Sequence, residues 1–445
     1  MTNPTNPGVS RRGFLRTASM AAAAAPFIVP AAARAQGDEA PSEKIRFGLI
    51  GCGGQGRGVM GAALGMRDTH VLAVCDVNRV NARKAKRIVD DHYGNKDCKE
   101  YSDYRELIAR DDIDAVIIAT PDHWHALVCV EAARARKDIY CEKPVTHHLR
   151  EGRAVADTAK ANNCIFQVGS MQRSFRDMKI AAQLVRNGYI GKIHHIEVGL
   201  PDGGHALWAD SWPEAPRIVD YDFYVGPSEW TPYHPERLDW NWRWWMKFGG
   251  SQMMDWIGHH GDIAHMGMGW DETGPRKVVP QKWEFSKEKN NVYNSPAQYL
   301  FECTYEGGTT MSVGSQSSMS QLFRDRQDTG TLWYGENDQW VYVSRGGLQV
   351  SSPEIAEIKF KDSDIQFRRQ SNHMRDFIDC IRTREATACP AEVGHRSASI
   401  GHLGKLACEL GATIEWDPAT ERLEGGEAFN HVLDLHYRGD WKLEA

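Results

Sequence analysis

The sequence predicts an α/β protein of two domains, a doubly wound parallel sheet followed by an α+β domain with an open, largely antiparallel sheet. Three observations support this prediction. Short apolar strands alternate with helical segments from Lys44 to about Ser170, and a glycine-rich turn follows the first of these strands. Beyond residue 297, several strands have the alternating pattern of an antiparallel sheet.

The first domain is expected over residues 44–170. Its strands are almost continuously apolar, which is typical of a parallel sheet covered by helices on both faces. The predicted strands are 45–50, 70–75, 114–119, 138–141 and 164–169, and the predicted helices are 54–66, 79–93, 103–110, 124–136 and 148–162.

The second domain is expected over residues 171–445. It contains a stretch, 202–248, that is rich in Trp and interleaved with Pro, Asp and Gly, a composition that suits an insertion better than a core. The predicted helices are 174–187, 253–266, 372–384 and 395–411, and the predicted strands are 192–200, 297–305, 308–314, 330–335 and 339–344.

An export signal is expected before both domains. Arg11 and Arg12 open an apolar, alanine-rich run that ends at Ala33-Arg34-Ala35. Twin arginines and an A-x-A ending are typical of the signal that exports folded proteins. We therefore expect a cleaved signal over 1–35, a linker over 36–43, and a periplasmic or otherwise exported protein. The alternative is an uncleaved anchor, but the run is short for a membrane span.

The composition argues against nucleic-acid binding. The 53 Lys and Arg residues nearly balance the 59 Asp and Glu residues, and no sustained basic stripe is present. Ten cysteines occur without any C-x-x-C pair. A protein that folds before export folds in a reducing compartment, so we expect mostly free, buried thiols.

The G-x-G-x-x-G at Gly51, Gly53 and Gly56 follows an apolar strand and opens a helix. Glycine permits the tight turn, the close approach of a pyrophosphate and the packing of helix on strand, and the helix N-terminus offers free N–H groups. Asp76 ends the second strand, where a carboxylate accepts hydrogen bonds from ribose hydroxyls and repels a 2′-phosphate. NAD is therefore favoured over NADP, although Arg79 keeps NADP open.

Two further segments lie at carboxyl ends of predicted strands, the edge where open α/β sheets bind ligands. The first contains Thr120, Pro121 and His125, and its histidines could contact a ligand or cap the following helix. The second contains Glu142 and Lys143.

Asp255 and His259 are four residues apart in a predicted helix, so they share one face. A carboxylate near an imidazole raises its basicity, as a general base near neutral pH requires. A metal pair would have the same spacing, but no third ligand is evident and no metal is expected. Buried polar residues of a capped helix are the structural alternative.

These motifs together resemble the Gfo/Idh/MocA family of oxidoreductases in order and approximate spacing. The resemblance implies a Rossmann domain and a second domain that carries the substrate site and often an oligomer interface, so a homo-oligomer (dimer or tetramer) is expected. It implies that Lys143 contacts substrate and nicotinamide, and that Asp255 and His259 form the acid–base pair. The predicted cofactor contacts are Gly51, Gly53, Gly54, Gln55, Gly56, Asp76, Thr120, Pro121, His125, Glu142, Lys143 and Gln172, and the predicted substrate contacts are Arg173, Trp208, Trp242, Trp245 and His260.

The chain departs from the family pattern in two places. The doubled His259-His260 leaves the proton-transfer residue open between the two. The Trp-rich stretch is expected to wall a sugar pocket, with burial of an oligomer interface as the competing interpretation.

The sequence thus predicts an NAD-dependent oxidoreductase with tightly bound cofactor, acting on a secondary hydroxyl of a sugar, glycoside or cyclic polyol. A redox-neutral glycosidase, lyase or epimerase is an alternative, although the His-Pro-Thr-His segment of the exported glycosidase relatives is missing from the sequence. A non-catalytic nucleotide-binding sensor is a second alternative.

Overall fold

The computed structural model describes residues 43–203, 207–285, 291–326, 328–368, 370–425 and 430–443. The expected signal over 1–35 lies outside these ranges, as does all but the last residue of the linker. The chain divides into two compact units, Met1–Lys44 and Ile45–Ala445, and the architecture below belongs to the second.

The first sheet has six parallel strands in the order β3-β2-β1-β4-β5-β6. Its strands are β1 (Ile45–Ile50), β2 (Thr69–Cys75), β3 (Lys99–Tyr101), β4 (Ala115–Ile118), β5 (Asp138–Cys141) and β6 (Phe166–Val168). This is the strand order of a doubly wound dinucleotide-binding domain, and the predicted fold class is confirmed. The sequence pattern missed β3, whose three residues include no fully buried side chain.

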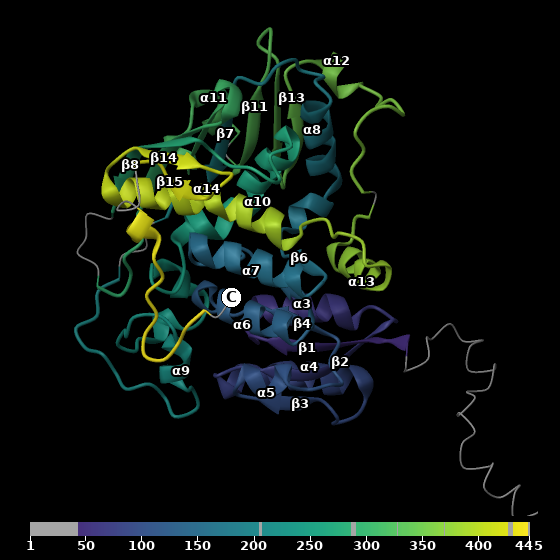
Figure 1. Ribbon diagram of the computed structural model, residues 1–445, viewed down its shortest axis with the longest axis vertical. Coiled ribbons are helices and arrows are strands. Elements are labelled where there is room, and N and C mark those ends of the chain that lie inside the picture. Colours follow the sequence, from purple (N-terminus) through teal and green to yellow (C-terminus); the bar gives the residue numbers. More distant parts are fainter. Residues whose placement is uncertain are drawn as a thin grey trace, which may run out of the picture. The chain divides into compact units, whose positions relative to one another are not determined.

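Helices flank this sheet (Figure 1). They are α3 (Gly54–Leu64), α4 (Arg79–Tyr93), α5 (Tyr104–Ile108), α6 (Asp122–Arg134) and α7 (Leu149–Ala161). Helix α4 shows how the sequence determines the start, the end and the buried face of such a helix. The Asn78 side chain caps its first turn, Gly94 ends it in the left-handed conformation, and Ala82, Ala85 and Val89 form its buried stripe.

The second sheet has nine strands in the order β13-β12-β11-β7-β10-β9-β8-β14-β15. Only β7 and β10 pair in parallel among its described strands, so the prediction of a largely antiparallel sheet is confirmed. Its strands are β7 (His195–Leu200), β8 (Lys277–Glu284), β9 (Gln298–Thr304), β10 (Thr310–Ser315), β11 (Gly330–Tyr334), β12 (Trp340–Ser344), β13 (Gly347–Val350), β14 (Ile414–Asp417) and β15 (Arg422–Leu423). The sequence pattern missed β8, β13, β14 and β15.

Helices α10 and α14 lie between the two sheets (Figure 1). Helix α14 packs against α7 on one side and β8 on the other, and α10 packs against α8 and β7. Residues on all sides of α10 are buried, which is the pattern of a core helix. The helices of this part are α8 (Arg176–Arg186), α9 (Tyr221–Val225), α10 (Ser251–Met268), α11 (Gln321–Arg324), α12 (Pro353–Ala356), α13 (His373–Thr383) and α14 (Ala391–Leu410).

The ten cysteines are all free, and nine of them are buried. This confirms the expectation of free, buried thiols. Within the described ranges, no helix combines the length and apolar character that crossing a membrane requires.

Candidate active site

A cavity of about 710 Å³ lies at the carboxyl edge of the first sheet. Its floor comes from the ends of β1, β2, β4 and β5, and its roof comes from α10 and the segment Leu238–Arg243. The cavity therefore lies where doubly wound folds bind nucleotides, and it reaches the residues predicted for proton transfer. Of the predicted residues, it is lined by Gly51, Gly53, Gly54, Gln55, Asp76, Thr120, Pro121, His125, Glu142, Lys143, Trp242, Asp255 and His259.

The glycine turn fits a diphosphate. Gly51 has φ +89°, and a Cβ there would lie 2.5 Å from the carbonyl oxygen of Ala119. A Cβ at Gly56 would lie 2.0 Å from the Gly51 oxygen, so Gly56 packs helix on strand and does not itself line the cavity. At Gly53 and Gly54 a Cβ would meet nothing within 4 Å, which leaves open space over the N-terminus of α3 for phosphate oxygens.

Asp76 is held with its carboxylate at the end of β2. Its two oxygens accept hydrogen bonds from the backbone N–H groups of Cys52 at 2.8 Å and Asn78 at 2.7 Å. Burial raises the pKa of Asp76 to about 6, so the group is mainly ionised at neutral pH. Each carboxylate oxygen keeps a lone pair for a ribose hydroxyl.

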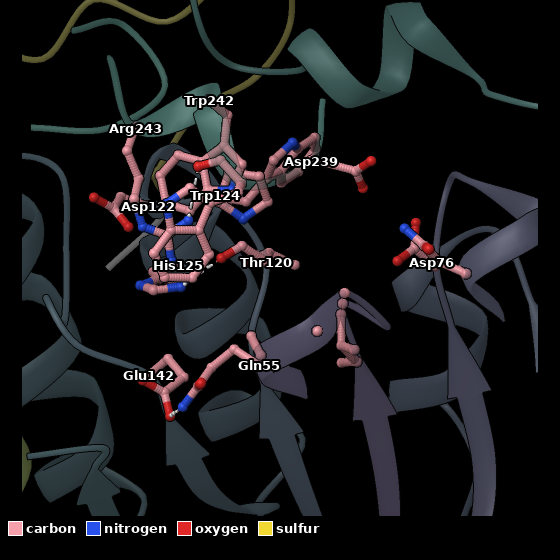
Figure 2. Close-up of a pocket in the computed structure, with 18 of the residues that line it drawn as sticks. Gln55, Asp76, Thr120, Asp122, Trp124, His125, Glu142, Asp239, Trp242 and Arg243 are labelled. Carbon is pink, nitrogen blue, oxygen red and sulfur yellow. Dashed lines mark hydrogen bonds between the residues drawn. The ribbon is translucent and has the colours of Figure 1, made fainter. Parts of the chain in front are cut away.

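Thr120 offers the cavity an unused polar atom. Its Oγ1 is buried and has no hydrogen-bond partner among the described residues, so a bound ligand can satisfy it. His125 differs, because its ring nitrogens contact the carbonyl oxygens of Pro144 at 2.8 Å and Thr120 at 2.9 Å. His125 thus joins two loops of the floor, and burial lowers its pKa to about 4. Gln55 donates a 2.9 Å hydrogen bond to Glu142 (Figure 2).

Lys143 and Asp255 form an ion pair of 2.6 Å across the cavity. Lys143 Nζ also donates to the main-chain oxygen of Asp255 at 3.0 Å, and Arg243 Nε donates to Asp255 Oδ1 at 3.2 Å. These two cations hold the pKa of Asp255 below its ordinary value against the opposing effect of burial. Asp255 is therefore ionised and fixes Lys143 in place.

His259 does not pair with Asp255 as the spacing suggested. The Asp255 carboxylate is taken by Lys143 and Arg243, and His259 Nδ1 is buried with no partner among the described residues. Burial and the charge of Lys143 hold the pKa of His259 well below its ordinary value. The expectation that Asp255 raises the basicity of this imidazole is therefore wrong; the ring is neutral and faces the cavity.

Asp122, Arg243 and Arg345 line the same cavity, and sequence reasoning missed all three. Asp122 is the first residue of α6, and burial raises its pKa to about 8, in contrast to Asp255 beside it. It directly follows Pro121, so the strand-end rule that selected Thr120 could have found it. For Arg243, which lies at the end of the Trp-rich stretch, and Arg345, between β12 and β13, no signal in a single sequence was available.

Two residues predicted to contact ligands, Gln172 and Arg173, are buried in the core and do not line the cavity. Arg173 forms a two-pronged ion pair with Asp262 at 2.7 and 2.9 Å and another pair with Asp271. Gln172 contacts His260 Nδ1 at 3.3 Å. The position of Arg173 and Gln172 after β6 is therefore explained by packing against α10.

His260, Trp208 and Trp245 also lie outside the cavity lining. His260 is 0% exposed, and its Nε2 contacts Thr329 at 3.1 Å. Trp245 stacks on Arg237 with 3.9 Å between the guanidinium carbon and the ring centroid, and Trp208 is 49% exposed. Of the three tryptophans predicted for substrate, only Trp242 lines the cavity. Among the described residues, no group of three or more potential ligands is arranged to hold a metal ion.

Two family models match the chain, and together they cover more than half of it. Residues 45–170 match the Gfo/Idh/MocA oxidoreductase family, NAD-binding Rossmann fold, and residues 335–443 match its C-terminal alpha/beta domain. Among curated relatives, a glycosyl hydrolase family 109 protein 2 of Shewanella sp. (strain ANA-3) is 30% identical over 210 residues, or 43% of this chain and 45% of the relative. The myo-inositol 2-dehydrogenase of Thermotoga maritima is 31% identical over 156 residues, or 35% of this chain and 44% of the relative. The chain thus spans less than half the length of these relatives.

Solved structures share the fold. The WlbA dehydrogenase from Bordetella pertussis, in complex with NADH and UDP-GlcNAcA, has a TM-score of 0.61 at 16% identity, covering 84% of this chain and 99% of that one. The myo-inositol dehydrogenase from Lactobacillus casei, in complex with NAD(H) and myo-inositol, has a TM-score of 0.56 at 17% identity, covering 84% and 97%. With both domains matched in order, this chain belongs to the Gfo/Idh/MocA family of oxidoreductases and carries that family's NAD-binding Rossmann domain.

Proposed function

We propose that this protein is an NAD-dependent oxidoreductase acting on a secondary hydroxyl of a sugar, glycoside or cyclic polyol. The observation that carries the proposal is the shared cavity: the Lys143–Asp255 pair and His259 line the same space as the glycine turn and Asp76. A substrate placed between them contacts the proton-transfer groups and the nicotinamide end together. NAD, when bound, supplies the hydride acceptor.

Lys143 is proposed to hold the substrate oxygen. An ammonium has three N–H donors, and Lys143 uses two of them on Asp255. The third is free to meet the reacting hydroxyl, and its positive charge stabilises the negative charge that develops on that oxygen. Asp255 acts by fixing the direction of this donor.

His259 is proposed to accept the proton. Its ring is neutral, because burial and Lys143 lower its pKa, and its Nδ1 is available. Between the doubled histidines the geometry favours His259, since both ring nitrogens of His260 are engaged with Gln172 and Thr329.

The relatives support a sugar or polyol as the substrate class. One is named myo-inositol 2-dehydrogenase, and a structural neighbour is a levoglucosan dehydrogenase in complex with NADH and levoglucosan. The Asp76 carboxylate supports NAD over NADP, because it would repel a 2′-phosphate.

A redox-neutral glycosidase is the second candidate, because several relatives are named glycosyl hydrolase family 109 proteins. In that cycle the hydride returns to the same molecule, so glycoside is cleaved without accumulation of NADH. The intact Lys143–Asp255 pair argues against a sensor that has lost its chemistry.

We further propose export by the twin-arginine route with the cofactor already bound, and assembly as a homo-oligomer. Replacing Arg11 and Arg12 by Lys should leave the protein in the cytoplasmic fraction; an unchanged distribution would contradict the export proposal. Light scattering of the mature protein tests the oligomer.

The function is tested with a panel of cyclic polyols, free sugars and aryl glycosides. NADH formation should follow addition of at least one polyol or sugar in the presence of NAD. Cleavage of a glycoside with no net NADH would select the redox-neutral cycle, and inactivity on the whole panel would contradict both.

A further inference from the structure

We propose that the described part of the insertion after residue 206, residues 207–248, is a cofactor clamp that walls the adenosine half of the NAD site and slows the dissociation of NAD. This assignment rests on the proposed function in taking NAD as the cofactor. It differs from the expectation that the insertion mainly walls the sugar pocket, and it follows from where the insertion is anchored and what it presents to the cavity.

The first anchor lies directly beyond Asp76. The insertion runs antiparallel to the loop that follows β2. Its backbone therefore lies beside the end of the cavity that contains Asp76. Three contacts join the two segments: a β-bridge between Asn78 and Val219, a 3.1 Å hydrogen bond from Arg79 N to Ile218 O, and a 3.0 Å hydrogen bond from Asp220 N to Val77 O.

The second anchor lies at the start of α6. Trp124 Nε1 donates a 3.0 Å hydrogen bond to the carbonyl oxygen of Tyr224, and the ring of His123 contacts the carbonyl oxygens of Tyr224 and Phe248 at 3.0 and 3.2 Å. Gly226 is required here, because a Cβ on it would lie 2.0 Å from the Trp124 ring. These buried contacts hold a second part of the insertion against the Rossmann domain.

Between the anchors, the insertion faces the cavity with Phe223, Tyr224, Leu238 and Asp239. The Rossmann domain lines this end with residues that follow β2 and β3, including the starts of α4 and α5: Asp76, Asn78, Asn81, Ser102 and Tyr104. The Phe223 ring stacks on that of Tyr104, with centroids 6.2 Å apart and an interplanar angle of 18°, and also on that of Trp441, with centroids 5.7 Å apart and an angle of 14°. Phe223 therefore joins the insertion to the Rossmann domain through an aromatic cluster. The insertion and the Rossmann domain thus enclose one compartment next to Asp76, the position at which a carboxylate binds the ribose of the adenosine half.

Asp239 adds a second carboxylate to this compartment. Figure 2 shows Asp239 and Asp76 on the same side of the cavity, and the charge of Asp239 contributes to the raised pKa of Asp76. Two carboxylates can accept hydrogen bonds from the ribose hydroxyls, and both repel a 2′-phosphate. The clamp therefore acts in two ways: it encloses the adenosine half of NAD, and its charge disfavours NADP.

Dissociation of NADH tests the clamp without requiring turnover. The protein is stripped, reloaded with NADH and mixed with excess NAD, and the loss of tryptophan-sensitised NADH fluorescence gives the dissociation rate. Phe223→Ala should release NADH about tenfold faster than the unaltered protein, the scale of one lost aromatic pair, because the ring that joins the insertion to Tyr104 is removed. Asp239→Asn, at an exposed position, should leave folding intact and raise the affinity for NADPH relative to NADH.

The controls replace an aromatic residue by alanine and an aspartate by asparagine in the insertion outside the cavity lining, Trp230→Ala and Asp210→Asn, and both should behave as the unaltered protein. Unaltered dissociation in Phe223→Ala together with unaltered NADPH affinity in Asp239→Asn would overturn the clamp and leave the proposed function standing. Slow release that these variants accelerate, in a protein inactive on every sugar and polyol, would support the clamp while the proposed function fails. Unaltered protein that binds no NADH would overturn both.

Discussion

Lys143 and Asp255 are 112 residues apart in the sequence, yet the Lys143 ammonium lies 2.6 Å from the Asp255 carboxylate. One follows β5 of the parallel sheet and the other lies on α10, the helix between the two sheets. Both side chains are only 11% exposed. Their contact joins the carboxyl edge of the parallel sheet to α10, and both residues line the same cavity.

Lys143→Met should lower kcat by a factor on the order of 10² or more, the scale of a lost catalytic donor. Arg243 still bonds Asp255 in this variant, so folding and NAD binding should change little. The measurement is steady-state turnover with the NAD dissociation constant determined in parallel. Lys192→Met, at an exposed position, is the matched control, and near-normal turnover in Lys143→Met would remove Lys143 from the catalytic assignment.

Trp242→Ala should raise KM with little change in oligomer size, because Trp242 lines the cavity beside Arg243. Trp208→Ala should leave KM unchanged, since that ring lies outside the lining. KM measurements and light scattering on both variants check this. If Trp242→Ala instead dissociates the assembly and spares KM, the tryptophans serve an oligomer interface.

Arg173→Ala should destabilise the protein by about 3–5 kcal/mol, the usual cost of leaving a buried carboxylate unpaired, here Asp262. KM should be nearly unchanged, because Arg173 does not line the cavity. Denaturant unfolding and kinetics of Arg173→Ala and of the exposed control Arg176→Ala check the two expectations. Normal stability with a large rise in KM would restore Arg173 as a substrate contact.

Asp122→Asn should change how stability depends on pH. Burial raises the pKa of Asp122 from the ordinary 3.8 to about 8, so the folded state binds a proton that the unfolded state has lost. The resulting stability is fully present below about pH 4 and is lost as pH rises through 8, at roughly 1.4 kcal/mol per pH unit within that window. Unfolding of cofactor-free protein at several pH values should show this slope reduced by that amount in Asp122→Asn. Identical pH dependence in both proteins would mean that Asp122 is ionised in the fold.

Local patterns predicted the parts of the fold that local physics determines. The turn from β1 into α3 needs glycine at Gly51 because no Cβ fits beside Ala119, and that requirement is legible in the sequence. Strand β8 escaped because Pro280 interrupts it and its two faces are only partly buried, which leaves no alternation. Strand β3 escaped because three residues are too few to show a pattern.

The residues of the candidate site could be predicted only where a polar or charged residue lies at or directly after the carboxyl end of a strand. Lys143 and Asp76 were found in this way, and both line the cavity. Arg173 also follows a strand end, but its partner Asp262 lies 89 residues away, and nothing local distinguishes an ion pair in the core from a substrate contact. The contact between Arg243 and Asp255 could not be predicted from the local sequence either, because it depends on how the insertion folds back.

The central claim, that hydride moves between a sugar or polyol carbon and NAD held in this cavity, is tested most directly by isotope transfer. Freshly purified mature protein should carry NAD detectable by mass and absorbance. Addition of a substrate deuterated at its ring carbons, without added nucleotide, should place deuterium on the bound cofactor and produce the absorbance band of reduced nicotinamide. A protein that arrives empty, and whose cofactor acquires no deuterium from any active substrate even with NAD supplied, would contradict the account.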